Sequence, residues 1–358
     1  MLRDALDRPL TDGFIVHGTD VETRWESDVP AVTPIDRFFV RNHTRPPVVD
    51  AGLWRLLLTG DGLYQDTTLS LADLRDLSPV TEELALECTG NGRHYFDRQQ
   101  GTPRPGTQWE TGAIGVARWT GVPLARVLRR VGLRPDAVSV MAVGLDDPYV
   151  EDGVDHGRVR RPLPIQKALD DVLVCWEMNG EPLPPDHGFP VRLVVPGWVG
   201  IASIKWLGEL RVTRRPEPSP WNTRWYRMHG EGWHGEEAVL GRMPVKSLVD
   251  TLEPVPAGRP VVLRGRAWSG EAAIAGVELS TDGGASWRAA RLVGQNRASC
   301  WTAWEAEVVF DRAGEHCLVT RAVDTDGRTQ PDVSPDNDQG YLFSAPIRQS
   351  LTVAGCAD

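Results

Sequence analysis

Apolar residues in the first two thirds of the chain recur with two different spacings. Mostly apolar runs at 54–58, 84–88 and 138–143 predict buried β-strands. Between the last two runs, apolar residues recur every three or four positions from Leu124 to Val131, and Gly132 follows. This spacing predicts an amphipathic helix that ends at a glycine C-cap.

A second helix is indicated by its capping residues. Ser70 and Asp73 have the spacing of a capping box at the start of the segment 70–77, and Pro79 ends that segment. Strands and short helices therefore mix without the strict alternation of a doubly wound sheet. We predict an α+β domain over residues 1–240.

The pattern changes near residue 240 to short strands separated by glycine turns. Apolar residues alternate with polar or bulkier ones at 261–267 and 304–310, which predicts half-buried strands. The segments 282–284 (Asp-Gly-Gly) and 326–327 (Asp-Gly) supply turns. This cadence predicts an immunoglobulin-like β-sandwich over residues 241–358.

Composition limits the classes of fold and function. The chain has 358 residues, more than one core normally supports, and 41% of them are hydrophobic, so two globular domains are expected. A formal net charge of -10 gives no basic surface for nucleic acid or an anionic membrane. A few converging arginines can still make one pocket positive in an acidic protein, so an anionic substrate stays open.

Neither a membrane span nor an export signal is evident in the sequence. The uncharged stretch 193–203 is too short to cross a membrane and is interrupted by Pro196 and Gly197. The first nine residues carry acids where a secretory signal needs an apolar core. The expected location is the cytoplasm, or the periplasm if an export signal was removed.

The five cysteines, Cys88, Cys175, Cys300, Cys317 and Cys356, are odd in number and contain no CxxC pair. This argues against a disulfide framework and against a zinc site, and it fits a reducing compartment. Cys300 and Cys317 fall in predicted strands of the second domain and could approach one another. The reduced state is the favoured interpretation, but the sequence leaves their pairing open.

Cys88 stands at the end of an apolar run and is followed by Thr89-Gly90-Asn91-Gly92-Arg93. The glycines allow a sharp turn that exposes the sulfur, and Arg93 favours the thiolate, which is the form that binds metals. The segment therefore predicts a metal ligand or a reactive thiol. Taken alone, it also allows a buried cysteine that merely precedes a turn.

Further segments accompany this one in a fixed order along the chain: 38–43 (Phe-Phe-Val-Arg-Asn-His), 109–114 (Trp-Glu-Thr-Gly-Ala-Ile), 117–119, 187–192, 195–197 and 204–208 (Ile-Lys-Trp-Leu-Gly). Together they resemble the sulfite oxidase family of molybdopterin enzymes, in the form of the bacterial sulfite oxidases and dehydrogenases without a heme domain. The resemblance covers roughly residues 30 to 348. Segments 264–270 and 280–287 resemble the family's dimerisation domain, which implies a homodimer.

The resemblance implies a role for particular residues. Cys88 matches the thiolate ligand of molybdenum. The residues that match the lining of the molybdopterin groove are His43, His187, Arg192, Ser203 and Lys205. The residues that match the substrate pocket are Arg41, Arg93, Trp109 and Tyr226. Singly, each could be a turn histidine, a surface charge or a packed aromatic, although Arg192 and Lys205 interrupt apolar runs where a buried charge needs an anionic partner.

Two departures from the family pattern bear on function. Gln339, in Asn337-Asp338-Gln339-Gly340, occupies the place of a substrate-site arginine, and no CxxCH motif is present for covalent heme. The resemblance implies oxidation of sulfite to sulfate, with electrons passed to a separate acceptor, expected to be a cytochrome. The alternatives are a sulfane dehydrogenase or a nitrate or sulfoxide reductase with the same cofactor, a non-catalytic binding protein, and a thiol enzyme that uses Cys88.

Overall fold

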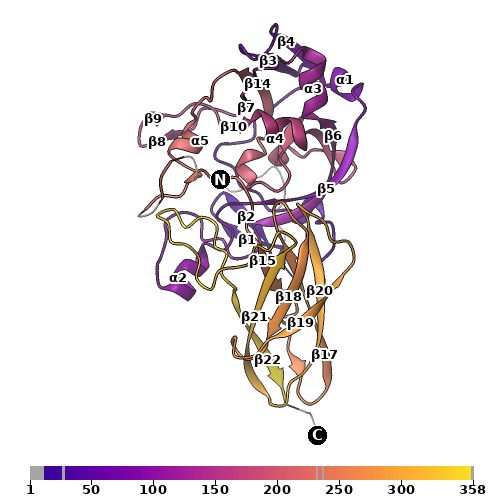
Figure 1. Ribbon diagram of the computed structural model, residues 1–358, viewed down its shortest axis with the longest axis vertical. Coiled ribbons are helices and arrows are strands. Elements are labelled where there is room, and N and C mark those ends of the chain that lie inside the picture. The colour runs from indigo at the N-terminus through magenta and orange to yellow at the C-terminus, as the bar shows by residue number, and fades with distance from the viewer. Residues whose placement is uncertain (1–11, 26–28, 231–232, 236–237, 356–358) are drawn as a thin grey trace.

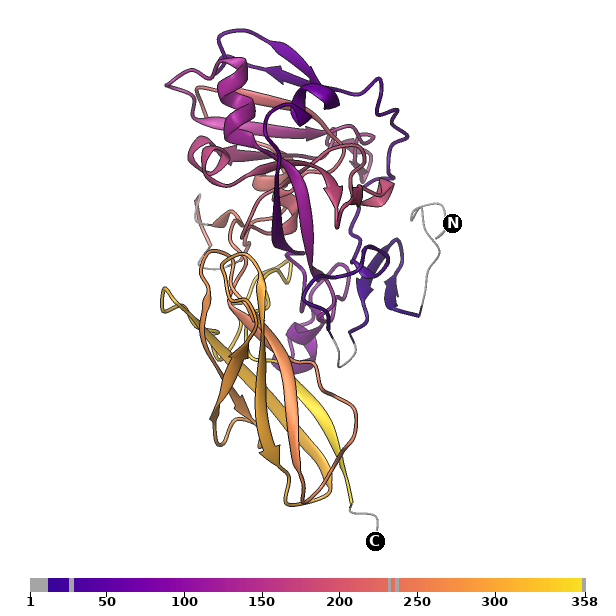
Figure 2. The ribbon, with the colours of Figure 1, turned by 90° about the vertical axis from the view of Figure 1, so that its right-hand side faces the viewer.

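The chain is built in two parts that follow one another along the long axis of the molecule (Figure 1, Figure 2). The computed structural model describes residues 12–25, 29–230, 233–235 and 238–355. A mixed part with strands and short helices forms one end, and a β-sandwich forms the other. The predicted order, an α+β domain followed by a sandwich, is confirmed. The boundary near residue 240 stays a prediction.

Two sheets form the first part, one mixed and one antiparallel. The first has the strand order β10 (Arg160–Pro164), β7 (Ser139–Gly144), β14 (Leu207–Thr213), β3 (Arg55–Thr59) and β4 (Thr67–Ser70). The second has the order β12 (Glu181–Pro182), β11 (Leu173–Met178), β6 (Ile114–Pro123) and β5 (Val80–Glu87), with β13 (Arg192–Val194) also paired to β11. Only β14 and β3 pair in parallel among these neighbours. Apolar side chains from both sheets meet in one core, so the sheets pack as layers.

Short helices cover these sheets and connect their strands. They are α1 (Leu71–Arg75), α2 (His94–Gln100), α3 (Leu124–Val131), α4 (Ile165–Asp170) and α5 (Pro220–Thr223), with single 3-10 turns at Ile35–Arg37, Pro185–His187 and Gly200–Ala202. The capping box of Ser70 and Asp73 is present at the start of α1, as predicted. Gly132 ends α3 with a φ of 90°, a conformation that glycine adopts without a Cβ penalty.

The three predicted strands of this part correspond to β3, β5 and β7. The strand expected at 84–88 is longer at its start and ends one residue earlier, at Glu87. The reason is that the Asn91 amide donates to the Cys88 carbonyl at 2.9 Å, which begins a turn at Cys88. The cysteine therefore lies just beyond the last paired residue of a buried strand.

Eight strands form the second part. They are β15 (Lys246–Val249), β16 (Val255–Pro256), β17 (Pro260–Trp268), β18 (Ile274–Ser280), β19 (Arg288–Val293), β20 (Trp301–Val309), β21 (Gly314–Asp324) and β22 (Arg348–Ala354). Strand β19 pairs with β18 through its first half and with β20 through its second half, so the two layers curl into one continuous sheet. The layers enclose an apolar core, as the alternation at 261–267 and 304–310 predicts. Two small hairpins, β1 (Phe14–His17) with β2 (Asp20–Thr23) and β8 (Val150–Glu151) with β9 (Val154–Asp155), complete the strands.

The segment 325–347, between β21 and β22, leaves the sandwich and returns to the first part beside α2 (Figure 1). The Ser334 amide donates to Gln100 Oε1 at 2.9 Å, and the Leu342 amide donates to the Thr89 carbonyl at 2.8 Å. The second contact joins this segment to the turn that carries Cys88. The sandwich part therefore supplies chain next to the candidate site.

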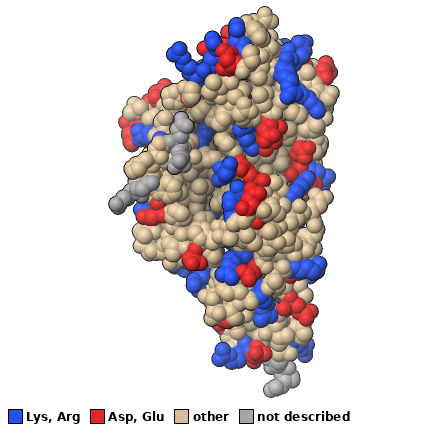
Figure 3. Space-filling view, in the orientation of Figure 1, with Lys and Arg blue, Asp and Glu red and all other residues tan. Residues whose placement is uncertain are grey.

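The face shown in Figure 3 carries no segregated patch of one charge, and the described cysteines form no disulfide. Basic and acidic side chains are interspersed over that face (Figure 3). Cys88, Cys175, Cys300 and Cys317 are free thiols, while Cys356 and the first eleven residues lie outside the described residues. No helix within the described ranges is long and apolar enough to span a bilayer.

The interior of the sandwich gives a direct stability prediction. A Cβ added to Gly265 would lie 2.0 Å from the Leu248 carbonyl oxygen and 2.3 Å from the Trp304 ring. We expect Gly265→Ala to lower the free energy of unfolding by about 2 to 3 kcal/mol, because the backbone must shift. Gly276→Ala is the control, since its Cβ would meet only Val323 at 3.7 Å. Urea unfolding that shows equal losses for both variants would contradict the packing described.

Candidate active site

One pocket in the first part gathers eight of the ten residues predicted for the site. It lies between the end of β5, the segment 38–43 and the segment 200–206, and it contains about 770 Å³ of space including its mouth. The eight residues are Arg41, His43, Cys88, His187, Arg192, Ser203, Lys205 and Tyr226.

Cys88 is fixed by backbone contacts. Its amide donates at 2.9 Å to the carbonyl of Ala113, the residue directly before β6. Burial raises the pKa of the Cys88 thiol, and the Gly90 amide, Arg41 and Arg93 only partly offset this effect. Arg93 thus favours the thiolate, as expected, but burial outweighs it. A cationic partner such as a metal ion favours the thiolate form.

Arg41 keeps its charge through a buried carboxylate that the sequence did not reveal. Its Nε lies 3.5 Å from Asp20 Oδ2. Burial alone would lower the pKa of Arg41, but Asp20 together with Tyr226, Cys88 and Tyr341 outweighs this effect, and the pKa is raised. Asp20 is the first residue of β2 and also accepts from Thr107 Oγ1 at 2.9 Å. No motif surrounds Asp20, so only the folded chain shows its role.

Arg93 lies beside the Cys88 turn but does not line the same pocket. Its Nε donates to the Gln339 carbonyl at 2.9 Å, and one terminal nitrogen donates to the Thr107 carbonyl at 2.8 Å. A Cβ on Gly90 would lie 2.9 Å from both terminal nitrogens, so the guanidinium packs directly on this glycine. Burial lowers the pKa of Arg93. The contact with Gln339 places the departure from the family pattern next to this arginine.

Trp109 is also outside the pocket lining. It is buried, and its ring packs edge-on against His17 at 5.4 Å and Phe39 at 6.5 Å between ring centres. A Cβ on Gly90 would lie 2.8 Å from its Cδ1, so the indole supports the turn after Cys88. Sequence reasoning expected a substrate contact here, and the structure shows aromatic packing behind that turn.

Lys205 and Arg192 are two further cationic side chains that line the pocket. Lys205 Nζ donates to the Asp186 carbonyl at 2.9 Å and to Asn42 Oδ1. The pKa of Lys205 is lowered to about 7, because burial and then Arg192 disfavour its charge. Arg192 donates to the carbonyls of His187 at 2.9 Å and Ser203 at 3.1 Å rather than to a carboxylate, and burial lowers its pKa to about 10.

The remaining pocket residues form a neutral polar edge. His43 Nε2 and Tyr226 Oη are joined by a hydrogen bond of 2.9 Å. The pKa of His43 lies well below its usual value because of burial, Arg41 and Lys205, so the imidazole is neutral. Burial raises the pKa of Tyr226, which therefore keeps its proton. The ring of Tyr226 stacks on Tyr341 from the returning segment, with 5.6 Å between centres.

His187 and Ser203 complete the set. The His187 ring packs edge-on against Phe38 at 5.4 Å, and Ser203 Oγ accepts from the Val195 amide at 3.0 Å. Their side chains thus also have structural partners within the first part. Both residues still line the pocket beside Arg192.

Two buried polar atoms of the pocket have no protein hydrogen-bond partner within the described chain, Asn42 Nδ2 and Asp146 Oδ1. Buried polar groups rarely stay unpaired, so these two atoms favour a ligand that offers both an acceptor and a donor. The cations Arg41, Arg192 and Lys205 require that this ligand carry negative charge. A polar, phosphate-bearing group that also brings a metal to Cys88 suits the unpaired atoms, the cations and the thiol together. Asn42 was within reach of sequence reasoning, because it lies inside the segment 38–43, whereas Asp146 has no sequence signal.

Comparison with known proteins identifies the class. The model of the oxidoreductase molybdopterin binding domain matches residues 43–221, and the model of the Mo-co oxidoreductase dimerisation domain matches residues 239–345. The protein is thus a molybdopterin oxidoreductase. Sulfite oxidase of Gallus gallus is 38% identical over 88% of this chain and 72% of its own length. The chain belongs to the sulfite oxidase family.

Other relatives have different printed activities. The mitochondrial sulfite oxidase of Homo sapiens is 35% identical over 90% of this chain, which spans 62% of that relative. A nitrate reductase of Ulva prolifera is 32% identical over 84% of this chain and 38% of its own length. The crystal structure of the sulfane dehydrogenase SoxCD from Paracoccus pantotrophus superposes with a TM-score of 0.81 and 27% identity, covering 94% of this chain and 85% of that one.

The lowered pKa of Lys205 predicts how the cofactor-free protein responds to pH. Between pH 7 and the ordinary lysine pKa near 10.5, the unfolded chain binds this proton and the folded chain does not. The free energy of unfolding therefore rises with pH across that window, with up to about 1.4 kcal/mol per pH unit coming from this group. We expect urea unfolding at pH 7 and 9 to show this rise in the wild type and a smaller one in Lys205→Met. Identical pH slopes for the two proteins would show that Lys205 is not buried as a neutral amine.

Proposed function

We propose that this pocket holds molybdopterin with Cys88 as the protein ligand of molybdenum, and that the enzyme oxidises sulfite to sulfate. The observation that carries the proposal is the placement of one buried thiol among Arg41, Arg192 and Lys205 in a single pocket. The group, when bound, supplies two-electron oxygen-atom transfer at the metal. Sulfite oxidases of Gallus gallus and Homo sapiens are among the relatives that cover most of this chain, which supports sulfite as the substrate.

The chain's own groups bind and orient both partners of the reaction. Arg192 and Lys205 hold the cofactor's negative charge, which restores the protonated form of Lys205. Asn42 and Asp146 supply the donor and acceptor that have no partner among the described residues. The neutral His43 accepts or donates at the polar edge of the cofactor together with Tyr226.

Arg41 and Arg93 flank the Cys88 turn on the substrate side. A guanidinium can grip two oxygens of an oxyanion, which orients sulfite with its sulfur toward the metal. Asp20 lies beside Arg41 and favours its charged form, and the carbonyls of Gln339 and Thr107 hold Arg93 in place. Tyr226 contributes a protonated hydroxyl that hydrogen-bonds to a reacting oxygen.

Electrons leave to a separate acceptor, for which a cytochrome is the proposed partner. The match to the dimerisation domain supports a homodimer. A second candidate function is sulfane dehydrogenation, which two observations favour. Gln339 removes one positive charge from the substrate side, and the SoxCD structure superposes over 94% of this chain. Side-by-side turnover of sulfite, nitrate and a sulfane sulfur compound decides between these substrates.

Cys88→Ser tests the ligand role. We expect the variant to fold, because serine preserves the backbone contacts of Cys88 with Ala113 and Asn91, and to lose sulfite turnover, because a hydroxyl is a poor substitute for a soft thiolate. Circular dichroism and a sulfite-dependent cytochrome reduction assay measure the two effects. Cys175→Ser, at a buried free thiol outside the pocket lining, is the control. Full turnover by Cys88→Ser would exclude the assignment.

Charge at the substrate side determines the affinity for sulfite. We expect Arg41→Gln and Arg93→Gln each to lower kcat/KM about 10- to 100-fold, because each removes a charged hydrogen bond worth about 1.5 to 3 kcal/mol. The exposed Arg55→Gln is the matched control. Gln339→Arg is expected to lower KM. If the first two variants and Gln339→Arg all leave sulfite kinetics unchanged, sulfite is not the substrate.

A further inference from the structure

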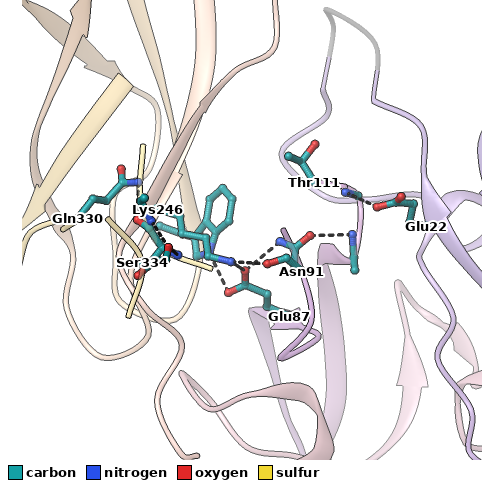
Figure 4. Close-up of polar contacts among 12 residues, drawn as sticks. Glu22, Glu87, Asn91, Thr111, Lys246, Gln330 and Ser334 are labelled. Carbon is teal, nitrogen blue, oxygen red and sulfur yellow. Dashed lines mark hydrogen bonds and ion pairs between the residues drawn. The ribbon is translucent and has the colours of Figure 1, made fainter. Parts of the chain in front are cut away.

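The residue immediately before Cys88 is a buried carboxylate held by the other part of the molecule. Glu87 Oε1 accepts from Lys246 Nζ at 2.7 Å, and Glu87 Oε2 accepts from Trp268 Nε1 at 3.0 Å (Figure 4). The Lys246 and Glu87 side chains are only 7% and 2% exposed. Both donors come from the sandwich, whereas Glu87 is the last residue of β5 in the first part.

The two donors are fixed relative to one another by the sandwich itself. Lys246 in β15 and Trp268 in β17 are directly paired positions of one antiparallel ladder. Their side chains therefore leave the same face of the sheet, and each binds a different oxygen of one carboxylate. A two-point contact of this kind sets the direction of the Glu87 side chain as well as its position.

Lys246 also holds the far side of the turn. Its Nζ donates to the Asn91 carbonyl at 2.9 Å, and Asn91 Nδ2 donates to Glu87 Oε1 at 2.9 Å. Asn91 Oδ1 accepts from the Ala113 amide at 3.2 Å, while the Ala113 carbonyl accepts from the Cys88 amide at 2.9 Å. The turn 88–91 is thus closed on both sides by groups that depend on one ammonium.

Stability alone does not account for this arrangement. Apolar side chains of similar volume stabilise a buried site at least as well as an ion pair, because the pair must be desolvated. What an ion pair adds is one defined geometry, and here the defined element is the turn that carries the candidate metal ligand. Lys246 contacts Glu87, which directly precedes Cys88, and Asn91, which closes the turn after it.

We propose that Lys246 is a positioning residue that fixes the Cys88 sulfur through Glu87 and Asn91, so that the sandwich part sets the place of the metal ligand. The inference rests on the proposed role of Cys88 in binding molybdenum. Its geometric claim, however, concerns the turn itself and applies to the protein with or without cofactor.

The test uses the full chain and three variants. Lys246→Met removes the ammonium and leaves Glu87 as a buried carboxylate without its counter-ion, although Trp268 and Asn91 still donate to it. Glu87→Gln/Lys246→Met removes both charges, so it restores stability but not the contact with the Asn91 carbonyl. Lys167→Met is the matched control, since Lys167 also bridges a carboxylate, Asp171 at 2.8 Å, and a carbonyl, Pro196 at 2.9 Å, away from Cys88.

The first readout is alkylation of each cysteine by iodoacetamide in cofactor-free protein, resolved by peptide mass spectrometry. In Lys246→Met we expect Cys88 to react at least about tenfold faster than in the wild type, with Cys317 unchanged, because only the turn opens more often. The double variant should regain thermal stability yet keep the fast Cys88 reaction. In Lys167→Met the Cys88 rate should stay at the wild-type value.

The proposal is overturned if the ratio of Cys88 to Cys317 reactivity in Lys246→Met equals that of the wild type. If Lys246→Met does not fold, the same comparison is made with the double variant. It is also overturned if the double variant regains both stability and the wild-type Cys88 rate, because the ion pair would then be purely stabilising. The second readout is the Mo(V) electron paramagnetic resonance spectrum of loaded enzyme, whose g values should shift in both Lys246 variants. A changed alkylation pattern with an unchanged spectrum supports the positioning of Cys88 and places the error in its proposed ligand role.

Discussion

Crowding of positive charge in one mostly buried pocket is the constraint on which the rest of the site depends. Arg41, Arg192 and Lys205 converge there, with Asp20 beside Arg41 and with the carboxyl groups of Asp146 and Asp186 near Lys205. Burial lowers the pKa of both Arg192 and Lys205, and Arg192 lowers that of Lys205 further, so keeping both groups charged in this pocket costs free energy. A phosphate-bearing cofactor removes that cost, which explains why the pocket combines cations with a thiol and unpaired amide and carboxylate atoms.

The site belongs to both parts of the molecule. The first part supplies the pocket and Cys88, while the sandwich returns the segment 325–347 to the Cys88 turn and holds Glu87 from behind. Tyr341 from that segment stacks on Tyr226, and the Gln339 carbonyl binds Arg93. A sandwich that served association alone would need none of these contacts. The second part therefore contributes to the geometry of the Cys88 turn and of the pocket edge at Tyr226.

Sequence reasoning reached the features whose signals are local. The strands, the capping box at Ser70 and the glycine end of α3 follow from spacing within a few residues, and the segment 38–43 identified one wall of the pocket. It could not reach pairs that meet only through tertiary packing. Glu87 and Lys246 are 159 positions apart. Asp20 has no motif around it, and the placement of Trp109 behind the Cys88 turn depends on packing against His17.

The central claim is that this pocket binds molybdenum through the Cys88 sulfur. X-ray absorption at the molybdenum K edge tests it most directly, on protein purified from a host that makes molybdopterin. The account predicts about one molybdenum per chain with a protein sulfur in its first shell, and about one sulfur fewer in Cys88→Ser. Identical sulfur shells in the wild type and Cys88→Ser would contradict it.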